Sequence, residues 1–194
     1  MPYLKAAVAL SALALASSAN AMEYSYRLYH NQVVIDASGQ IQFNESQIYA
    51  NWLSTHPELS ARRIVSIVFN SAGGDPVGAA TLGELIQHFR LNTGVAGGGV
   101  CASACVFAWG AGALKSAAPD SGIGVHQPAL TIANGAVTPT DAKGFLDFAS
   151  AESAALARLG APANVIEAEE TTPPSSIYWL TPADLAAWNV HITR

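Results

Sequence analysis

RIVSIVFNSAGGD occupies residues 63–75 of this 194-residue chain. Its first seven residues are rich in β-branched side chains, which is typical of a buried strand. The glycine-containing turn NSAGGD follows at once, and residues 77–91 then place hydrophobic side chains on one face of a helix. A buried strand that turns directly into an amphipathic helix indicates a βαβ unit.

The same alternation continues on both sides of this stretch. It predicts one α/β domain with a mostly parallel sheet. Asn44, with Gln47 at the capping-box position, is expected to cap the first helix, and Thr181 with Pro182 the last. Strands are expected at residues 24–35, 63–69, 92–99, 113–118, 122–125 and 178–180. Helices are expected at residues 45–54, 77–91, 103–110, 141–159, 163–170 and 182–188.

The first 21 residues have the features of a secretory signal peptide. Lys5 precedes an apolar run from residue 6 to 16, and Ala19-Asn20-Ala21 forms a small-x-small cleavage site. We therefore expect a signal peptide at 1–21, a mature domain at 22–194, and a periplasmic or secreted location. The alternative is an uncleaved N-terminal anchor. No later apolar stretch is long enough for a membrane helix.

Composition excludes some classes of partner. Hydrophobic residues make up 51% of the chain and charged residues 12%, with a formal net charge of −5. This argues against disorder. The chain also lacks the excess of basic residues typical of a protein that binds nucleic acid or an anionic membrane surface. Neither partner is therefore expected once the signal peptide has been cleaved.

Gly73 and Gly74 connect the buried strand to its helix. Glycines there allow backbone N–H groups to face a ligand, and a helix N-terminus adds positive potential, which suits an oxyanion or a phosphate. A plain tight turn is the alternative explanation. The triple glycine at residues 97–99 lacks the Lys and Ser/Thr of a phosphate-binding loop.

CASAC, residues 101–105, places a serine among small residues at the start of an apolar helix. Ser103 is either a nucleophile close to free N–H donors or an ordinary helix N-cap. Cys101 and Cys105 could pair in an oxidising compartment, but only if Cys101 precedes the helix. No histidine lies at ligand spacing from them, so no metal is expected.

VHQP, residues 125–128, follows a short strand. A histidine at the end of a parallel strand can point into the crevice where such folds bind ligands. A neutral imidazole is the usual general base for serine, although His126 alone could equally be a hydrogen-bonded structural histidine.

Taken in order, these motifs resemble the proteolytic subunit of the Clp protease, within the Clp protease/crotonase superfamily. That family has a strand, Asn-Ser-Pro-Gly-Gly and a helix, then a serine among small residues, then Ile-His-Gln-Pro. An exported branch of predicted periplasmic proteins is the most similar. The counterparts here are FNSAGG (69–74), CASAC (101–105), AGALK (111–115), APDS (118–121), VHQP (125–128) and WLTPAD (179–184).

The resemblance implies a spiral of βαβ units and a serine peptidase acting on peptides or unfolded proteins. Ser103 would be the nucleophile, His126 its base, and the N–H groups of Gly74 and Ala104 the oxyanion hole. No cofactor is expected. Assembly into homo-oligomers is implied, although the segment 131–140 is shorter than the family's ring-docking handle. No ATPase partner is expected outside the cytoplasm.

The chain departs from the family where a third catalytic residue, an Asp, should precede WLTPAD. PPSSIY, residues 173–178, contains no acid. Ser175 or Ser176 could hydrogen-bond the imidazole, or Glu169 or Glu170 could approach from the preceding helix. The missing acid leaves open a catalytically weakened or inactive module that binds peptides or a partner.

Two other chemistries remain open in the same fold. A Ser–Lys peptidase of the signal peptide peptidase A kind would use Lys115 or Lys143 as its base, but their spacing from Ser103 is unfavourable and His126 would be unexplained. Crotonase-type acyl-CoA chemistry suits the fold but not an exported location.

Overall fold

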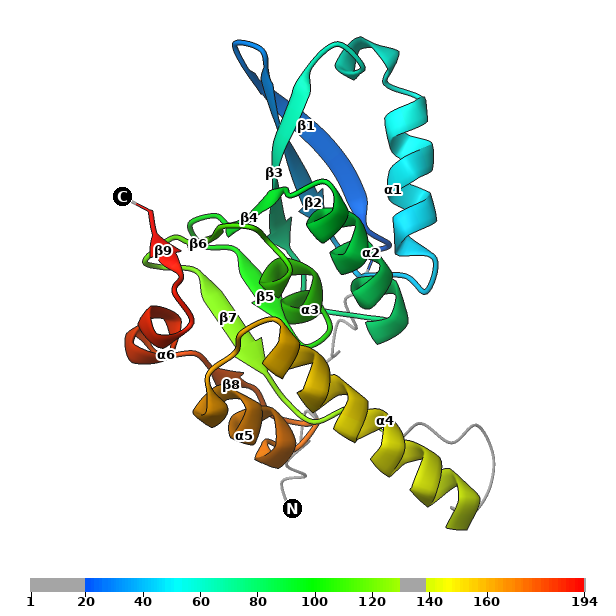
Figure 1. Ribbon diagram of the computed structural model, residues 1–194, viewed down its shortest axis with the longest axis vertical. Coiled ribbons are helices and arrows are strands. Elements are labelled where there is room, and N and C mark those ends of the chain that lie inside the picture. The colour runs from blue at the N-terminus through cyan, green and yellow to red at the C-terminus, as the bar shows by residue number, and fades with distance from the viewer. Residues whose placement is uncertain (1–19, 130–138, 194) are drawn as a thin grey trace, which may run out of the picture.

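The computed structural model describes residues 20–129 and 139–193 (Figure 1). The predicted signal peptide and the segment 131–140 lie almost wholly outside these residues. The strands are β1 (Glu23–Tyr29), β2 (Gln32–Ser38), β3 (Arg63–Asn70), β4 (Asn92–Val95), β5 (Val100–Ala102), β6 (Lys115–Ala117), β7 (Gly122–Val125), β8 (Tyr178–Trp179) and β9 (His191–Ile192). The helices are α1 (Glu45–Ser54), α2 (Pro76–His88), α3 (Cys105–Gly110), α4 (Pro139–Arg158), α5 (Ala163–Thr171) and α6 (Pro182–Ala187), with a 3-10 turn at Pro57–Leu59.

Two sheets form the framework, as the α/β expectation requires. The larger has the order β1-β2-β3-β4-β6-β9, and all its neighbouring strands are parallel except for the β1–β2 pair. In the smaller sheet β5 and β7 are parallel and β8 is antiparallel to β7. A bridge between Ser71 and Cys101 joins the two sheets just beyond the end of β3. In Figure 1, α1 lies at one end of the molecule, and α4 and α5 lie at the other.

Two predicted strands are each divided in the structure. Residues 24–35 form parts of the hairpin β1–β2, which turns at His30, a residue with a φ of 58°. Residues 92–99 form β4 and a turn before β5, with Gly99 N–H donating to the carbonyl of Ala96. The turn at His30 lacks the Gly or Pro that usually marks a turn. The second turn contains glycines, at residues 97–99, but they lie between two β-compatible segments.

The capping predictions have opposite outcomes. Thr181 is the N-cap of α6 and Pro182 lies in the first turn, as predicted. The Thr181 side chain accepts from the Asp184 N–H, and these two residues form a full capping box. Asn44 is the N-cap of α1, but its side chain makes no capping hydrogen bond. The buried carboxylate of Glu45 instead accepts from the Gln42 N–H at 2.7 Å and from the Tyr24 hydroxyl at 2.7 Å. A carboxylate one residue later therefore holds the turn that enters α1.

The core joins the helices to the sheets around large aromatic side chains. Trp109 of α3 and Trp188, just after α6, are fully buried and meet edge-to-face with ring centroids 5.3 Å apart. The Trp188 indole N–H donates to the carbonyl of Leu159 at 3.0 Å. These contacts tie the segment after α6 to α3 and to the end of α4, so Trp188 belongs to the same core as Trp109.

Candidate active site

The predicted site elements follow the carboxyl ends of three strands. Gly73 and Gly74 come after β3, Ser103 after β5 and His126 after β7. Since β5 and β7 are parallel neighbours and β5 is bridged to the end of β3, the three loops meet at one edge. This is where open α/β sheets bind their ligands.

Ser103 occupies a strained turn between β5 and α3. Its φ is 56°, in the left-handed region that non-glycine residues rarely adopt. Its N–H donates to the carbonyl of Gly124 at 2.9 Å. The helix begins at Cys105, two residues later than predicted, so Ser103 stands outside it and is not its N-cap.

A disulfide joins Cys101 to Cys105 across this turn. Their Cα atoms are 5.3 Å apart and both side chains are fully buried. Cys101 lies in β5, so it precedes the helix, which is the arrangement that a bridge over this short spacing requires. The loop that presents Ser103 is thus closed covalently at its base.

The glycine turn lies against the serine turn. A Cβ on Gly73 would stand 2.8 Å from the Cβ of Ser103, and a Cβ on Gly74 would stand 2.2 Å from the carbonyl oxygen of Ile41. The φ values of Gly73 and Gly74 are 108° and 140°. Only glycine fits both the space and the backbone conformation here.

Two backbone N–H groups remain available beside Ser103. The Gly73 N–H donates to Ser71 Oγ at 3.1 Å, and the Asp75 N–H to the Ile41 carbonyl at 2.9 Å. Within residues 20–129 and 139–193, the N–H groups of Gly74 and Ala104 have no acceptor. They are free to donate to an anion, the role expected of them from the resemblance.

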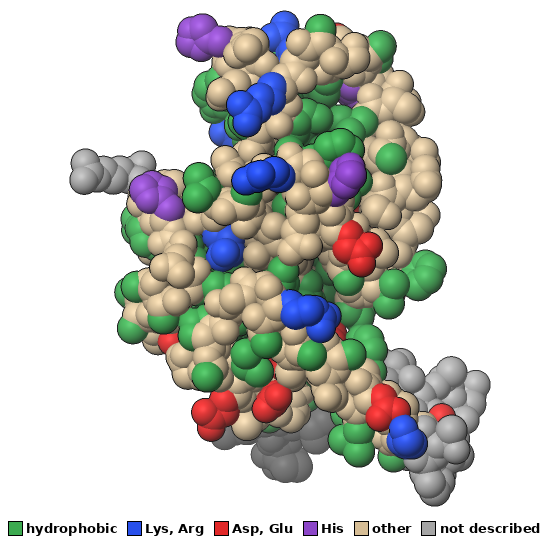
Figure 2. Space-filling view, viewed as in Figure 1, with side chains coloured by type: hydrophobic (Ala, Val, Ile, Leu, Met, Phe, Trp, Pro, Cys, Tyr) green, Lys and Arg blue, Asp and Glu red, His purple; other side chains and the backbone are tan. Residues whose placement is uncertain are grey.

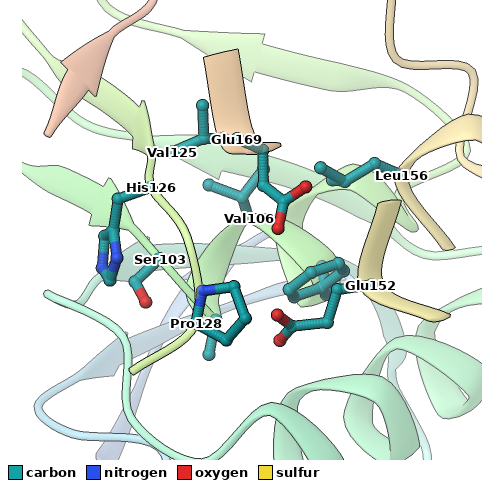
Figure 3. Close-up of a pocket in the computed structure, with 10 residues that line it drawn as sticks. Ser103, Val106, Val125, His126, Pro128, Glu152, Leu156 and Glu169 are labelled. Atoms are coloured by element: carbon teal, nitrogen blue, oxygen red, sulfur yellow. The ribbon is translucent and has the colours of Figure 1, made fainter. Parts of the chain in front are cut away.

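His126 lies beside Ser103 on one wall of a cavity (Figure 3). Its Nδ1 is 2.6 Å from the carbonyl oxygen of Gln127. A carbonyl only accepts, so Nδ1 carries the proton and a neutral ring has its free lone pair on Nε2. Among the described residues, neither Nε2 nor Ser103 Oγ makes a hydrogen bond, so both are available to a substrate.

The cavity has a volume of about 20 Å³. That is room for about one water molecule, so the hollow beside Ser103 and His126 does not by itself hold a substrate side chain. Its lining combines the serine and histidine with apolar side chains and two carboxylates: Ser103, Ala104, Val106, Phe107, Val125, His126, Pro128, Glu152, Leu156 and Glu169.

The missing third acid is not replaced by any of the residues considered for it. Ser175 and Ser176 do not line the cavity. Glu169 does, but its Oε2 accepts from Ser153 Oγ at 2.8 Å, not from His126. Glu170 contributes only its carbonyl, which accepts from the Gln127 side chain. The far side of the imidazole therefore contacts a backbone carbonyl, which orients the ring but carries no negative charge.

Sequence reasoning missed Glu152 entirely. On α4 it follows Phe148 by four residues and precedes Leu156 by four, so it interrupts the apolar face of that helix. That interruption was the available signal. Burial and the nearby charge of Glu169 raise the pKa of Glu152 to about 7, and burial also raises the pKa of Glu169.

Neither candidate lysine lines the cavity. Lys115 begins β6, at the opposite end of a parallel strand from the edge that holds Ser103, and burial lowers its pKa. Lys143 is exposed and pairs with Asp147 at 2.5 Å. Within the described part of the chain, the Ser–Lys alternative therefore has no lysine in the cavity to act as its base.

No group of three His, Cys, Asp or Glu side chains within residues 20–129 and 139–193 is arranged to hold a metal ion. In the same part of the chain, no helix is both long and apolar enough to cross a membrane.

Comparison with known proteins identifies the family. The Clp protease family matches residues 16–143, about two thirds of the sequence, so the chain belongs to the Clp protease family. Among solved structures, a mutant of the 1510-N membrane-bound stomatin-specific protease is similar, with a TM-score of 0.55 and 18% identity over 80% of this chain and 76% of that one. That similarity supports the fold. Among curated proteins, none matches the sequence.

Proposed function

We propose that this chain is an exported serine peptidase that cleaves peptide or unfolded-protein substrates with a Ser103–His126 pair. Family membership supports a peptidase-like function in general terms. The observation that carries the specific proposal is the strained Ser103, which shares a cavity wall with a histidine whose Nε2 is free. Export rests on the signal-like N-terminus and agrees with the disulfide, which persists in oxidising compartments.

The chemistry has two steps. His126 Nε2 takes the Ser103 hydroxyl proton as Oγ attacks the peptide carbonyl, and the N–H groups of Gly74 and Ala104 hold the resulting oxyanion. The C–N bond then breaks, and the imidazolium protonates the leaving amine. Water, deprotonated by the same nitrogen, next hydrolyses the acyl–Ser103 ester and regenerates the hydroxyl.

A fluorophosphonate probe tests this assignment, because it reacts only with an activated serine. The wild type is expected to form one covalent adduct at Ser103, whereas S103A forms none and H126A labels at least about a hundredfold more slowly. S54A and H191A, which change exposed residues of α1 and β9, serve as matched controls and should label normally. A wild type that is folded but unlabelled would contradict the proposal.

A second function is favoured by one observation. The Gln127 carbonyl behind His126 stabilises an imidazolium less than a carboxylate would. A chain that keeps the cavity but lacks the charge could bind a peptide or a partner without cleaving it. Binding of peptides to a folded but unlabelled wild type would establish this alternative.

A further inference from the structure

Ser71 has a buried hydroxyl that serves as neither the nucleophile nor the base. The residue directly follows β3, is 2% exposed and does not line the cavity beside Ser103. A buried hydroxyl is costly unless it is hydrogen-bonded. The groups to which it is bonded therefore indicate what Ser71 contributes to the site.

The Ser71 hydroxyl contacts both peptide groups that flank Gly73. Its Oγ accepts from the Gly73 N–H at 3.1 Å and donates to the Gly73 carbonyl at 3.3 Å. The Ile41 N–H donates to the same carbonyl at 2.9 Å. Both polar groups of Gly73 are thus held within the protein, so the Gly73 N–H is not available to a ligand.

The Gly73 carbonyl and the Gly74 N–H belong to the same peptide group. Among the described residues every peptide bond is trans, and in a planar trans peptide the C=O and the N–H point in opposite directions. Anchoring the carbonyl therefore directs the Gly74 N–H away from Ser71 and Ile41. These anchors are needed because glycines, here with φ values of 108° and 140°, restrict their own backbone least.

The backbone of Ser71 holds the loop that carries the nucleophile. Its N–H donates to the Val100 carbonyl at 2.7 Å, and its carbonyl accepts from the Ala102 N–H at 3.0 Å. Both partners belong to β5, and Ala102 directly precedes Ser103. Ser71 therefore fixes the glycine turn and the serine turn relative to each other.

Backbone N–H groups are the donors on which an oxyanion at this site would depend. Lys and Arg are absent from the described lining of the cavity, and Figure 2 shows the basic side chains of this face scattered over the surface. The N–H groups of Gly74 and Ala104 remain. Such a donor is effective only when it is already aimed at the place where negative charge develops, so the direction of the Gly74 N–H affects the rate.

We propose that Ser71 is a positioning residue whose hydroxyl aims the Gly74 N–H at the oxyanion that forms when Ser103 attacks the substrate. This inference rests on the proposed peptidase function. Without the hydroxyl, the Gly73 N–H loses its acceptor and the Gly73 carbonyl is left with the Ile41 N–H, so the turn can rotate. The transition state is then stabilised less, whereas no group that contacts the bound substrate has been removed.

S71A tests this role with a fluorophosphonate, whose phosphoryl oxygen takes the place of the oxyanion. The maximal labelling rate should fall at least about tenfold, less than the roughly 100–1,000-fold typical of a donor that is removed outright, because the Ile41 anchor remains. The probe concentration that gives half of the maximal rate should stay within about twofold of the wild-type value, since binding precedes the reaction. S121A is the matched control and should label normally, because Ser121 Oγ donates to the Ala118 carbonyl at 2.7 Å in a turn that does not line the cavity.

A second pair of variants controls for bulk and for folding. Threonine and valine are both β-branched and similar in size, but only threonine keeps the hydroxyl. S71T should therefore label at least about tenfold faster than S71V, under conditions where urea unfolding shows both to be folded. A folded but unlabelled wild type would count against the peptidase proposal itself. With a labelled wild type, equal maximal rates for S71A and S121A, or for S71T and S71V, would overturn the positioning role.

Discussion

Replacing Cys101 and Cys105 together by alanine removes the covalent link across the turn that presents Ser103. The bridge closes a loop of only five residues, for which the loss of unfolded-chain entropy stabilises the native state by about 2 kcal/mol. The φ of 56° at Ser103 costs roughly 1–2 kcal/mol. The two quantities are similar, so removing the bridge costs the fold about as much free energy as the strained φ of Ser103 does.

C101A/C105A should therefore lower the free energy of unfolding by about 2 kcal/mol, which corresponds to a decrease in Tm of about 4–8 °C for a chain of this size. Without the bridge the turn can relax, so the fraction with Ser103 correctly placed falls. A strain of about 1.4 kcal/mol corresponds to a roughly tenfold slower reaction with a fluorophosphonate.

Urea unfolding and probe labelling, each with and without a thiol reductant, measure the two effects. Both cysteines are fully buried, so the reductant is added during unfolding, when it can reach the bridge. It should destabilise the wild type and leave C101A/C105A unchanged, which separates loss of the bridge from loss of two buried sulfur atoms. A double variant with the stability and labelling rate of the wild type would refute this account of the turn.

Three other changes test separate parts of the structure. G74A should lower labelling of the serine at least about tenfold and destabilise the fold, because its Cβ would stand 2.2 Å from the Ile41 carbonyl; normal labelling would show that the turn can adjust. W188A should cost about 3–5 kcal/mol in urea unfolding, since Trp188 is fully buried, and a cost below 1 kcal/mol would contradict its place in the core. Burial and the charge of Glu169 raise the pKa of Glu152 from 4.5 to about 7, so the folded state holds this proton more tightly and stability should fall as pH rises from about 4.5 to 7. Thermal unfolding of E152Q should show a smaller fall over that range, and an equal fall would assign it to other groups.

The sequence was informative where one local pattern had one explanation. The β-branched run before Gly73 predicted β3, and Thr181 with Pro182 predicted the start of α6, because these signals act within a few residues. Local signals did not predict the hairpin turn at His30, because a histidine adopts the left-handed conformation there without the glycine that usually marks such a position. The place of Glu152 in the cavity was missed because the residues around it depend on how α4 packs against the rest of the chain.

The order of the motifs along the chain determined the family and the candidate residues. The glycine turn, the serine motif and the histidine motif each follow a strand, and parallel strands end at one edge of the sheet. Tertiary structure alone decided what surrounds them: a backbone carbonyl of Gln127 behind the imidazole, and the carboxylates of Glu152 and Glu169 across the cavity. The contact with Gln127 is local and depends on the rotamer of His126, whereas Glu152 and Glu169 lie more than twenty residues along the chain from Ser103 and His126. Spacing in the sequence carries no information about such distances, because packing sets them.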